Sequence, residues 1–134
     1  MKQPKWIDRI EALDHWEAGY WVARGWDRDG RVRSTAAIDV VIDARRAGSP
    51  ADQAAASIGG IAYAEARGIS KVEVQIDEGR WLNADLRDPL SEMTWVVWRA
   101  DLPLKAGDHT VTVRAYERDG TAQSSAPHTK RVRL

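Results

Sequence analysis

Residues 71–77 alternate strictly between apolar and polar side chains, and this alternation constrains the fold more than any other feature of the chain. Val72, Val74 and Ile76 fall on one side and polar residues on the other, which is typical of a half-buried β-strand. Similar short segments bounded by turn residues cover residues 36–42, 57–64, 80–86, 94–100, 108–116 and 130–134. Short strands at such regular intervals indicate an all-β, antiparallel sandwich. We expect this domain to span residues 37–134.

Turns and faces can be predicted within this domain. Gly79 is expected to supply the positive φ of the turn that follows Asp77, and Asp119-Gly120 is expected to form a second tight turn. Residues 80–86 are expected to form the single strand that returns from the first turn. We expect the inward residues of segment 108–116 to be Val111, Val113 and Ala115. Residues 130–134, three of which are basic, should form an edge strand whose charges prevent pairing with a further strand.

The tryptophans have two interpretations. The segment 94–100 has apolar and aromatic residues on both faces, so we expect it to be central in its sheet or covered on both sides. Trp81, Trp95 and Trp98 are accordingly expected in the core, where indoles bury large apolar areas. For Trp21 and Trp26 two roles stay open: packing within the fold, or an exposed platform on which a sugar or peptide stacks.

The first 36 residues have a different character. Residues 5–13 alternate and favour a strand, and four of the ten aromatic residues lie between Trp16 and Trp26. This stretch is too short to form a core alone, so we interpret residues 1–36 as an N-terminal extension of the sandwich.

Composition excludes several functions. Lys plus Arg and Asp plus Glu are both 20, so the net charge is zero, which argues against nucleic acid or an acidic membrane as a partner. The chain has no Cys, so thiolate metal sites and a cysteine nucleophile are excluded. His15, His109 and His128 lack metal-site spacing, and His109 is expected to face solvent at a turn. We predict no metal ligand and no catalytic residue. Without an apolar run of membrane length or a signal peptide, we expect a soluble chain, with periplasm and cytoplasm both open.

An ordered series of segments resembles the sulfite oxidase family of molybdopterin oxidoreductases. The first two segments resemble the end of the molybdopterin-binding domain, and the others resemble the C-terminal dimerisation domain that follows it. The resemblance covers nearly the whole chain and is carried by Lys5-Trp6-Ile7-Asp8-Arg9-Ile10, Gly19-Tyr20-Trp21-Val22-Ala23-Arg24-Gly25-Trp26, Ile58-Gly59-Gly60-Ile61-Ala62-Tyr63-Ala64, Gly68-Ile69-Ser70-Lys71-Val72-Glu73-Val74, Gly79-Arg80-Trp81, Thr94-Trp95-Val96-Val97-Trp98-Arg99 and His109-Thr110-Val111-Thr112-Val113-Arg114-Ala115.

The resemblance implies an immunoglobulin-like, Greek-key sandwich over residues 37–134, preceded by the tail of a catalytic domain in residues 1–36. It implies a parent enzyme that oxidises sulfite or a related small substrate at a molybdenum–molybdopterin centre. The family binds molybdenum through a cysteine, which this chain lacks. We therefore expect no cofactor in this chain and no activity by itself, and we expect a fragment of a longer enzyme or a truncated reading frame.

The resemblance implies two site residues. Of these, Arg67 also stands out by its position between a predicted strand and Gly68, where the alternative is an ordinary solvated surface arginine. Lys5 matches a lysine in a segment that contacts the pterin cofactor. Arg67 is similar to an arginine that the dimerisation domain extends toward the substrate oxyanion, and guanidinium suits such an anion.

The expected function is dimerisation, with a second copy and the upstream molybdopterin-binding domain as partners. The domain would also line the substrate pocket. The alternative is a free-standing immunoglobulin-like module that binds a sugar or peptide through exposed Trp.

Overall fold

The computed structural model describes residues 6–43 and 56–134. The chain divides into two compact units, with the division between Arg31 and Val32, and each unit is described by itself. β1 begins at Thr35, shortly after this division. The assignment of the N-terminal segment to a preceding catalytic domain stays a prediction.

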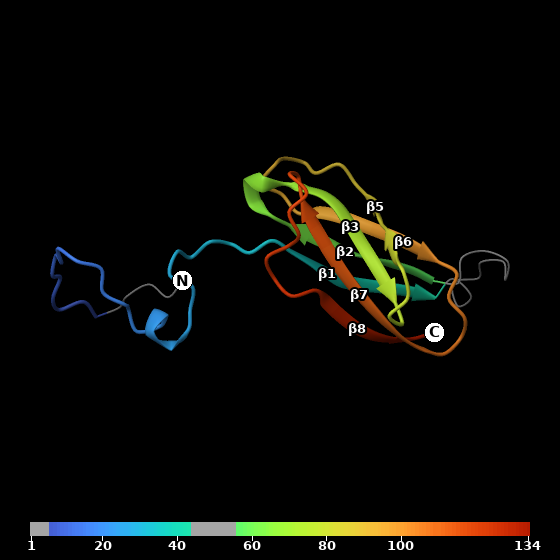
Figure 1. The fold of residues 1–134 in the computed structure, drawn as a ribbon, viewed down its shortest axis with the longest axis horizontal. Coiled ribbons are helices and arrows are strands. Elements are labelled where there is room, and N and C mark those ends of the chain that lie inside the picture. The colour runs from blue at the N-terminus through green and yellow to red at the C-terminus, as the bar shows by residue number, and fades with distance from the viewer. Residues whose placement is uncertain (1–5, 44–55) are drawn as a thin grey trace. The chain divides into compact units, whose positions relative to one another are not determined.

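The second unit is a sandwich of two four-stranded antiparallel sheets, whose strands overlie one another in Figure 1. One sheet has the order β1-β2-β6-β5 and the other the order β4-β3-β7-β8. This is the arrangement of immunoglobulin-like domains, with an additional strand beside the third, so the predicted fold class is confirmed. The strands are β1 (Thr35–Asp43), β2 (Ala56–Tyr63), β3 (Ile69–Ile76), β4 (Trp81–Asn83), β5 (Asp85–Leu86), β6 (Val96–Leu102), β7 (Asp108–Glu117) and β8 (His128–Arg133).

The core lies between the two sheets and consists of the inward residues of alternating segments. Val72 and Val74 of β3 are completely buried, as are Val111, Val113 and Ala115 of β7. They pack against inward residues of the other sheet, among them Ile58 and Trp98. The period-two pattern therefore identified the inward face correctly, and β8 lies at a sheet edge as predicted.

The prediction of one strand over residues 80–86 was wrong. The chain crosses from one sheet to the other within this segment, because β4 pairs with β3 whereas β5 pairs with β6. Leu82 and Leu86 both pack against the core, from opposite sheets. Ala84 lies between the two strands, and its N–H still donates to Val72 O at 2.9 Å.

The turn after β3 also differs from its prediction. Asp77 (φ 47°) and Glu78 (φ 60°) adopt the left-handed conformation, and Gly79 does not. Aspartate tolerates this conformation better than most residues, and the Asp77 carboxylate is held by the Thr110 N–H at 2.7 Å. The second expected turn, at Asp119-Gly120, is confirmed: the Gly120 N–H donates to the Glu117 carbonyl at 3.0 Å, and Gly120 has a φ of 89°.

Strand β6 is central in its sheet, which confirms one of the two alternatives expected for this segment, but it is not covered on both faces. Its residues alternate between buried and exposed, with Trp98 1% and Val97 49% exposed. Trp95, just before the strand, is 48% exposed, and Trp81 is partly exposed. Only Trp98 of the three predicted core tryptophans is fully buried, because the other sheet covers only the inward face of β6.

The first unit contains no strand among residues 6–31, so the strand predicted over residues 5–13 is wrong for its described part. A strand needs a neighbour to satisfy its backbone hydrogen bonds, and alternation alone does not supply one. The unit contains one short 3-10 helix, η1 (Val22–Arg24). In the part of the chain that the structure describes, no helix is long and apolar enough to cross a membrane.

Candidate functional site

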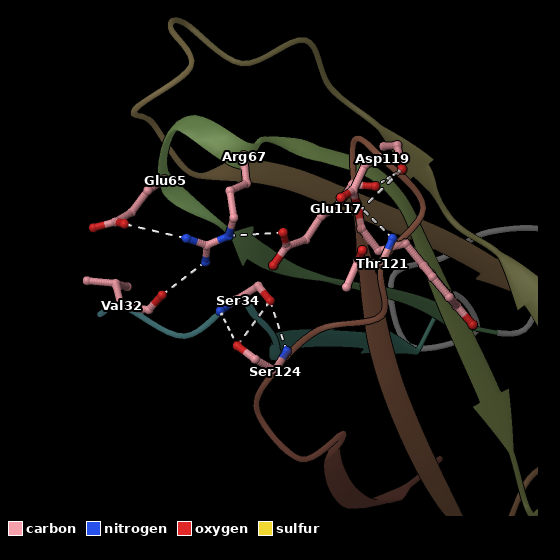
Figure 2. Close-up of polar contacts among 10 residues, drawn as sticks. Val32, Ser34, Glu65, Arg67, Glu117, Asp119, Thr121 and Ser124 are labelled. Atoms are coloured by element: carbon pink, nitrogen blue, oxygen red, sulfur yellow. Dashed lines mark hydrogen bonds and ion pairs between the residues drawn. The ribbon is translucent and has the colours of Figure 1, made fainter. Parts of the chain in front are cut away.

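Arg67 ends a short 3-10 helix, η2 (Glu65–Arg67), which connects β2 of one sheet with β3 of the other. The backbone of this connection is tightly constrained. Glu65 has a φ of 51°, which is uncommon for a residue with a side chain, and Gly68 closes the helix with a φ of 64°. Arg67 is the residue of this loop whose side chain points back over the sandwich (Figure 2).

The Arg67 guanidinium bonds to three separate parts of the second unit. Its Nε lies 3.0 Å from Oε2 of Glu117 in β7, and its Nη2 donates to the Val32 carbonyl at 3.0 Å. Its Nη1 is 3.6 Å from Glu65. The Glu117 side chain is only 9% exposed. Arg67 thus links the last residues of β7, the η2 loop and the start of the sandwich chain (Figure 2).

These partners determine what Arg67 can do chemically. Two carboxylates beside one guanidinium neutralise its charge, so an oxyanion would have to displace at least one of them. The proposed role of Arg67 in a substrate pocket stays a prediction. Lys5, the other residue suggested by the family resemblance, lies outside the described residues.

Two serines, Ser34 and Ser124, form reciprocal hydrogen bonds beside Arg67, just before β1 begins (Figure 2). The Ser34 N–H donates to Ser124 Oγ at 3.0 Å, and the Ser124 N–H donates to Ser34 Oγ at 2.9 Å. Ser34 is fully buried, and its carbonyl accepts from the Ser125 N–H at 3.1 Å. Sequence reasoning missed this reciprocal arrangement because the two serines are 90 residues apart and no local motif marks them.

Two predicted turn aspartates have the structural role expected of them. Asp119 accepts a hydrogen bond from the Thr121 N–H at 2.9 Å, which lowers the pKa of its carboxyl group. Asp77 bonds to His109, and this hydrogen bond is the main cause that lowers the pKa of Asp77. Both side chains therefore stabilise local structure, as the turn interpretation predicted.

We expected His109 to face solvent, but its side chain is largely buried. Its side chain is 15% exposed, with Nδ1 2.6 Å from Asp77 Oδ2 and Nε2 3.0 Å from the Lys105 carbonyl. Both partners are acceptors, so the imidazolium form is favoured, and Asp77 above all raises the pKa of His109. This pair is part of the fold rather than a metal site. No described group of three or more His, Cys, Asp or Glu residues could hold a metal ion.

The outer surface of the β1-β2-β6-β5 sheet carries an apolar patch that sequence reasoning did not identify. Tyr63 and Trp95 stack with ring centroids 4.7 Å apart, and Val40, Ile42 and Val97 are 47–49% exposed. Ile61 pairs directly with Val97 across the sheet and is partly exposed. We define the outer patch as Val40, Ile42, Ile61, Tyr63, Trp95 and Val97. The sequence signal that marks this outward side of β6 is the alternation of Arg99 and Asp101 with apolar residues, since Val97 lies on the same side.

The outer surface of the other sheet is charged. Glu73 lies at its centre and accepts hydrogen bonds from Lys71 at 2.9 Å and from Arg114 at 2.8 Å. Burial raises the pKa of Glu73, but these two bonds outweigh it and hold the pKa below its ordinary value. Arg114 also lies over the Trp81 ring, 3.9 Å from its centre. The two sheets therefore present chemically different outer surfaces.

The aromatic residues of the first unit form a small exposed cluster. Trp21 and Trp26 stack with centroids 5.0 Å apart, and they are 40% and 56% exposed. Tyr20 contacts Trp21 edge-on, and the Arg24 guanidinium lies 3.6 Å from the Tyr20 ring centre. None of residues 6–31 is fully buried. This geometry is compatible with the stacking platform left open by the sequence.

No protein-family model matches the sequence, and no curated protein matches it.

Replacing Arg67 by alanine should lower the free energy of unfolding by about 1–3 kcal/mol, because Glu117 would lose the cation that compensates its burial. Urea unfolding followed by circular dichroism would measure this change. The control is Arg99→Ala, whose ion pair with Asp101 is much more exposed and should contribute less than about 1 kcal/mol. Equal losses in the two variants would contradict the role assigned to Arg67.

Proposed function

We propose that this chain is the C-terminal dimerisation domain of a sulfite-oxidase-like molybdenum–molybdopterin oxidoreductase. The observation that carries the proposal is the immunoglobulin-like strand order, which is the fold that the family resemblance implies. Four of the five resembling segments after residue 57 coincide with β2, β3, β6 and β7, which form the centres of the two sheets, and the fifth leads into β4.

The described residues do not fit the family's cofactor. The chain has no Cys to bind molybdenum, and the described residues contain no metal-binding group. The one predicted pterin contact, Lys5, is not described. We therefore assign no redox step to this chain. Its role is structural: it associates with a second copy and so holds together two catalytic domains that precede it.

Sedimentation velocity of the isolated chain, at concentrations from about 1 to 100 µM, tests this function. We expect a species of twice the 15.0 kDa chain mass that dissociates on dilution. A monomer at every concentration, with the circular dichroism spectrum of a folded β protein, would contradict the proposal.

The exposed stack of Trp21 and Trp26 supports a second candidate, a free-standing module that binds a sugar or peptide. This candidate requires no dimer. The sedimentation experiment therefore separates the two functions.

A further inference from the structure

The two outer surfaces of the sandwich differ in how well they suit association with a second copy of the chain. The outer patch contains no charged side chain. At its border, Arg99 and Asp101 form an ion pair with each other at 2.9 Å, and Asp101 also accepts from Ser57. The border also carries the exposed Asp39, next to Val40 in β1, and the exposed Asp85, which lies opposite Arg99 in the strand register. An apolar centre with a polar border is the usual anatomy of a protein interface.

The opposite outer surface has no comparable area. By strand register, four cations and two carboxylates lie on the outward side of the β4-β3-β7-β8 sheet: Lys71, Arg114, Arg131, Arg133, Glu73 and Asp108. Two copies that met through this surface would bring an excess of positive charge together and would have to desolvate it.

The register of the sheet places the outer patch across its three longest strands. Ala37, Ile61 and Val97 lie side by side on β1, β2 and β6. Strands of eight residues about 4.8 Å apart give this face a plan area of roughly 400 Å². Standard interfaces bury about 800 Å² per partner, so the patch can form the apolar centre of such an interface while its polar border supplies the rest.

We infer that the outer patch is the surface through which two copies of this chain associate. The inference rests on the proposed function and specifies which surface performs it. A second copy is the partner that the charges favour. The chain has zero net charge and does not repel itself, and a patch without charges offers no electrostatic recognition to an acidic or basic partner.

Association through this patch should be sensitive to a single charge at its centre. Val97→Asp would place a carboxylate at an exposed position of β6, where the fold does not need the valine but the interface does. We expect its dimer dissociation constant to rise at least tenfold. Val40→Asp, on strand β1 at the other side of β2, should have the same effect and serves as a second variant if Val97→Asp fails to fold.

The matched control is Thr112→Asp, which adds the same charge to the centre of the opposite outer surface. The dimer dissociation constant of Thr112→Asp should equal that of the wild type. All variants are compared by sedimentation velocity, with circular dichroism as the test of folding.

The possible results separate this inference from the proposed function. Monomeric Val97→Asp and Val40→Asp chains with a dimeric Thr112→Asp chain would support the inference. If the two patch variants dimerise like the wild type, the patch is not the interface, although the proposed function survives. If the wild type itself is monomeric, the proposed function fails and this inference fails with it.

Discussion

Replacing Gly60 by alanine should destabilise the sandwich by about 3 kcal/mol or more, at the upper end of overpacking effects. Gly60 is buried in β2, between β1 and β6. A Cβ atom there would collide with the carbonyl group of Ala37 on the adjacent strand and would lie 2.9 Å from Cζ2 of the Trp98 ring. The Ala37 carbonyl belongs to the backbone of a paired strand, so it cannot move aside without breaking the ladder. A loss of this size is a large fraction of the free energy of unfolding of a small domain, which is about 5–15 kcal/mol.

The neighbouring glycine provides the control for this prediction. At Gly59 a Cβ atom would be 3.2 Å from the Trp98 carbonyl oxygen and 3.3 Å from Cγ1 of Val40. Small shifts can relieve such contacts, so Gly59→Ala should cost about 1 kcal/mol or less. Urea unfolding followed by circular dichroism would compare the two variants. Similar midpoints would show that the close approach at Gly60 does not constrain the sheet.

Trp98→Ala should cost about 3–5 kcal/mol, because it removes the largest fully buried side chain and leaves a cavity between the two sheets. Trp98 is 1% exposed, and it belongs to the one cluster that contains residues of both sheets. Its Nε1 has no hydrogen-bond partner among the described residues. Trp98→Phe removes this unpaired group and keeps an aromatic ring, so it should lose much less stability than Trp98→Ala.

Trp95→Ala is the matched control for the core position. Trp95 lies three residues earlier and is 48% exposed, with Tyr63 as its stacking partner. Its removal should cost about 1 kcal/mol. All three tryptophan variants are compared at one protein concentration, since self-association would add to apparent stability. A loss in Trp95→Ala as large as in Trp98→Ala would contradict the assignment of inward and outward faces.

The site around Arg67 could not be predicted from the sequence. Arg67 itself was chosen through a family resemblance, but its partners Val32 and Glu117 lie 35 and 50 residues away along the chain. No periodic pattern in a sequence indicates which carboxylate an arginine side chain will contact. The partners are set by the crossing of η2 between the sheets, which is a property of the assembled sandwich.

The sequence by itself determined the long strands of the sandwich and the inward residues of β3 and β7. Alternate side chains of a strand point to opposite faces, so Val72, Val74, Val111 and Val113 could be placed in the core without a structure. This rule is local and depends only on a few neighbouring residues.

Only the tertiary structure decided which sheet each strand joins and which faces stay uncovered. Residues 80–86 divide between two sheets, and β6 buries Trp98 while it exposes Val97. From Trp98 to Leu102 the polar residues Arg99 and Asp101 alternate with buried apolar residues and mark the free face. At the start of the strand Val96 and Val97 are both apolar, and only the tertiary structure shows that Val97 stays uncovered. That difference arises because one sheet can cover only one face of the other, and it leaves the outer patch for a partner.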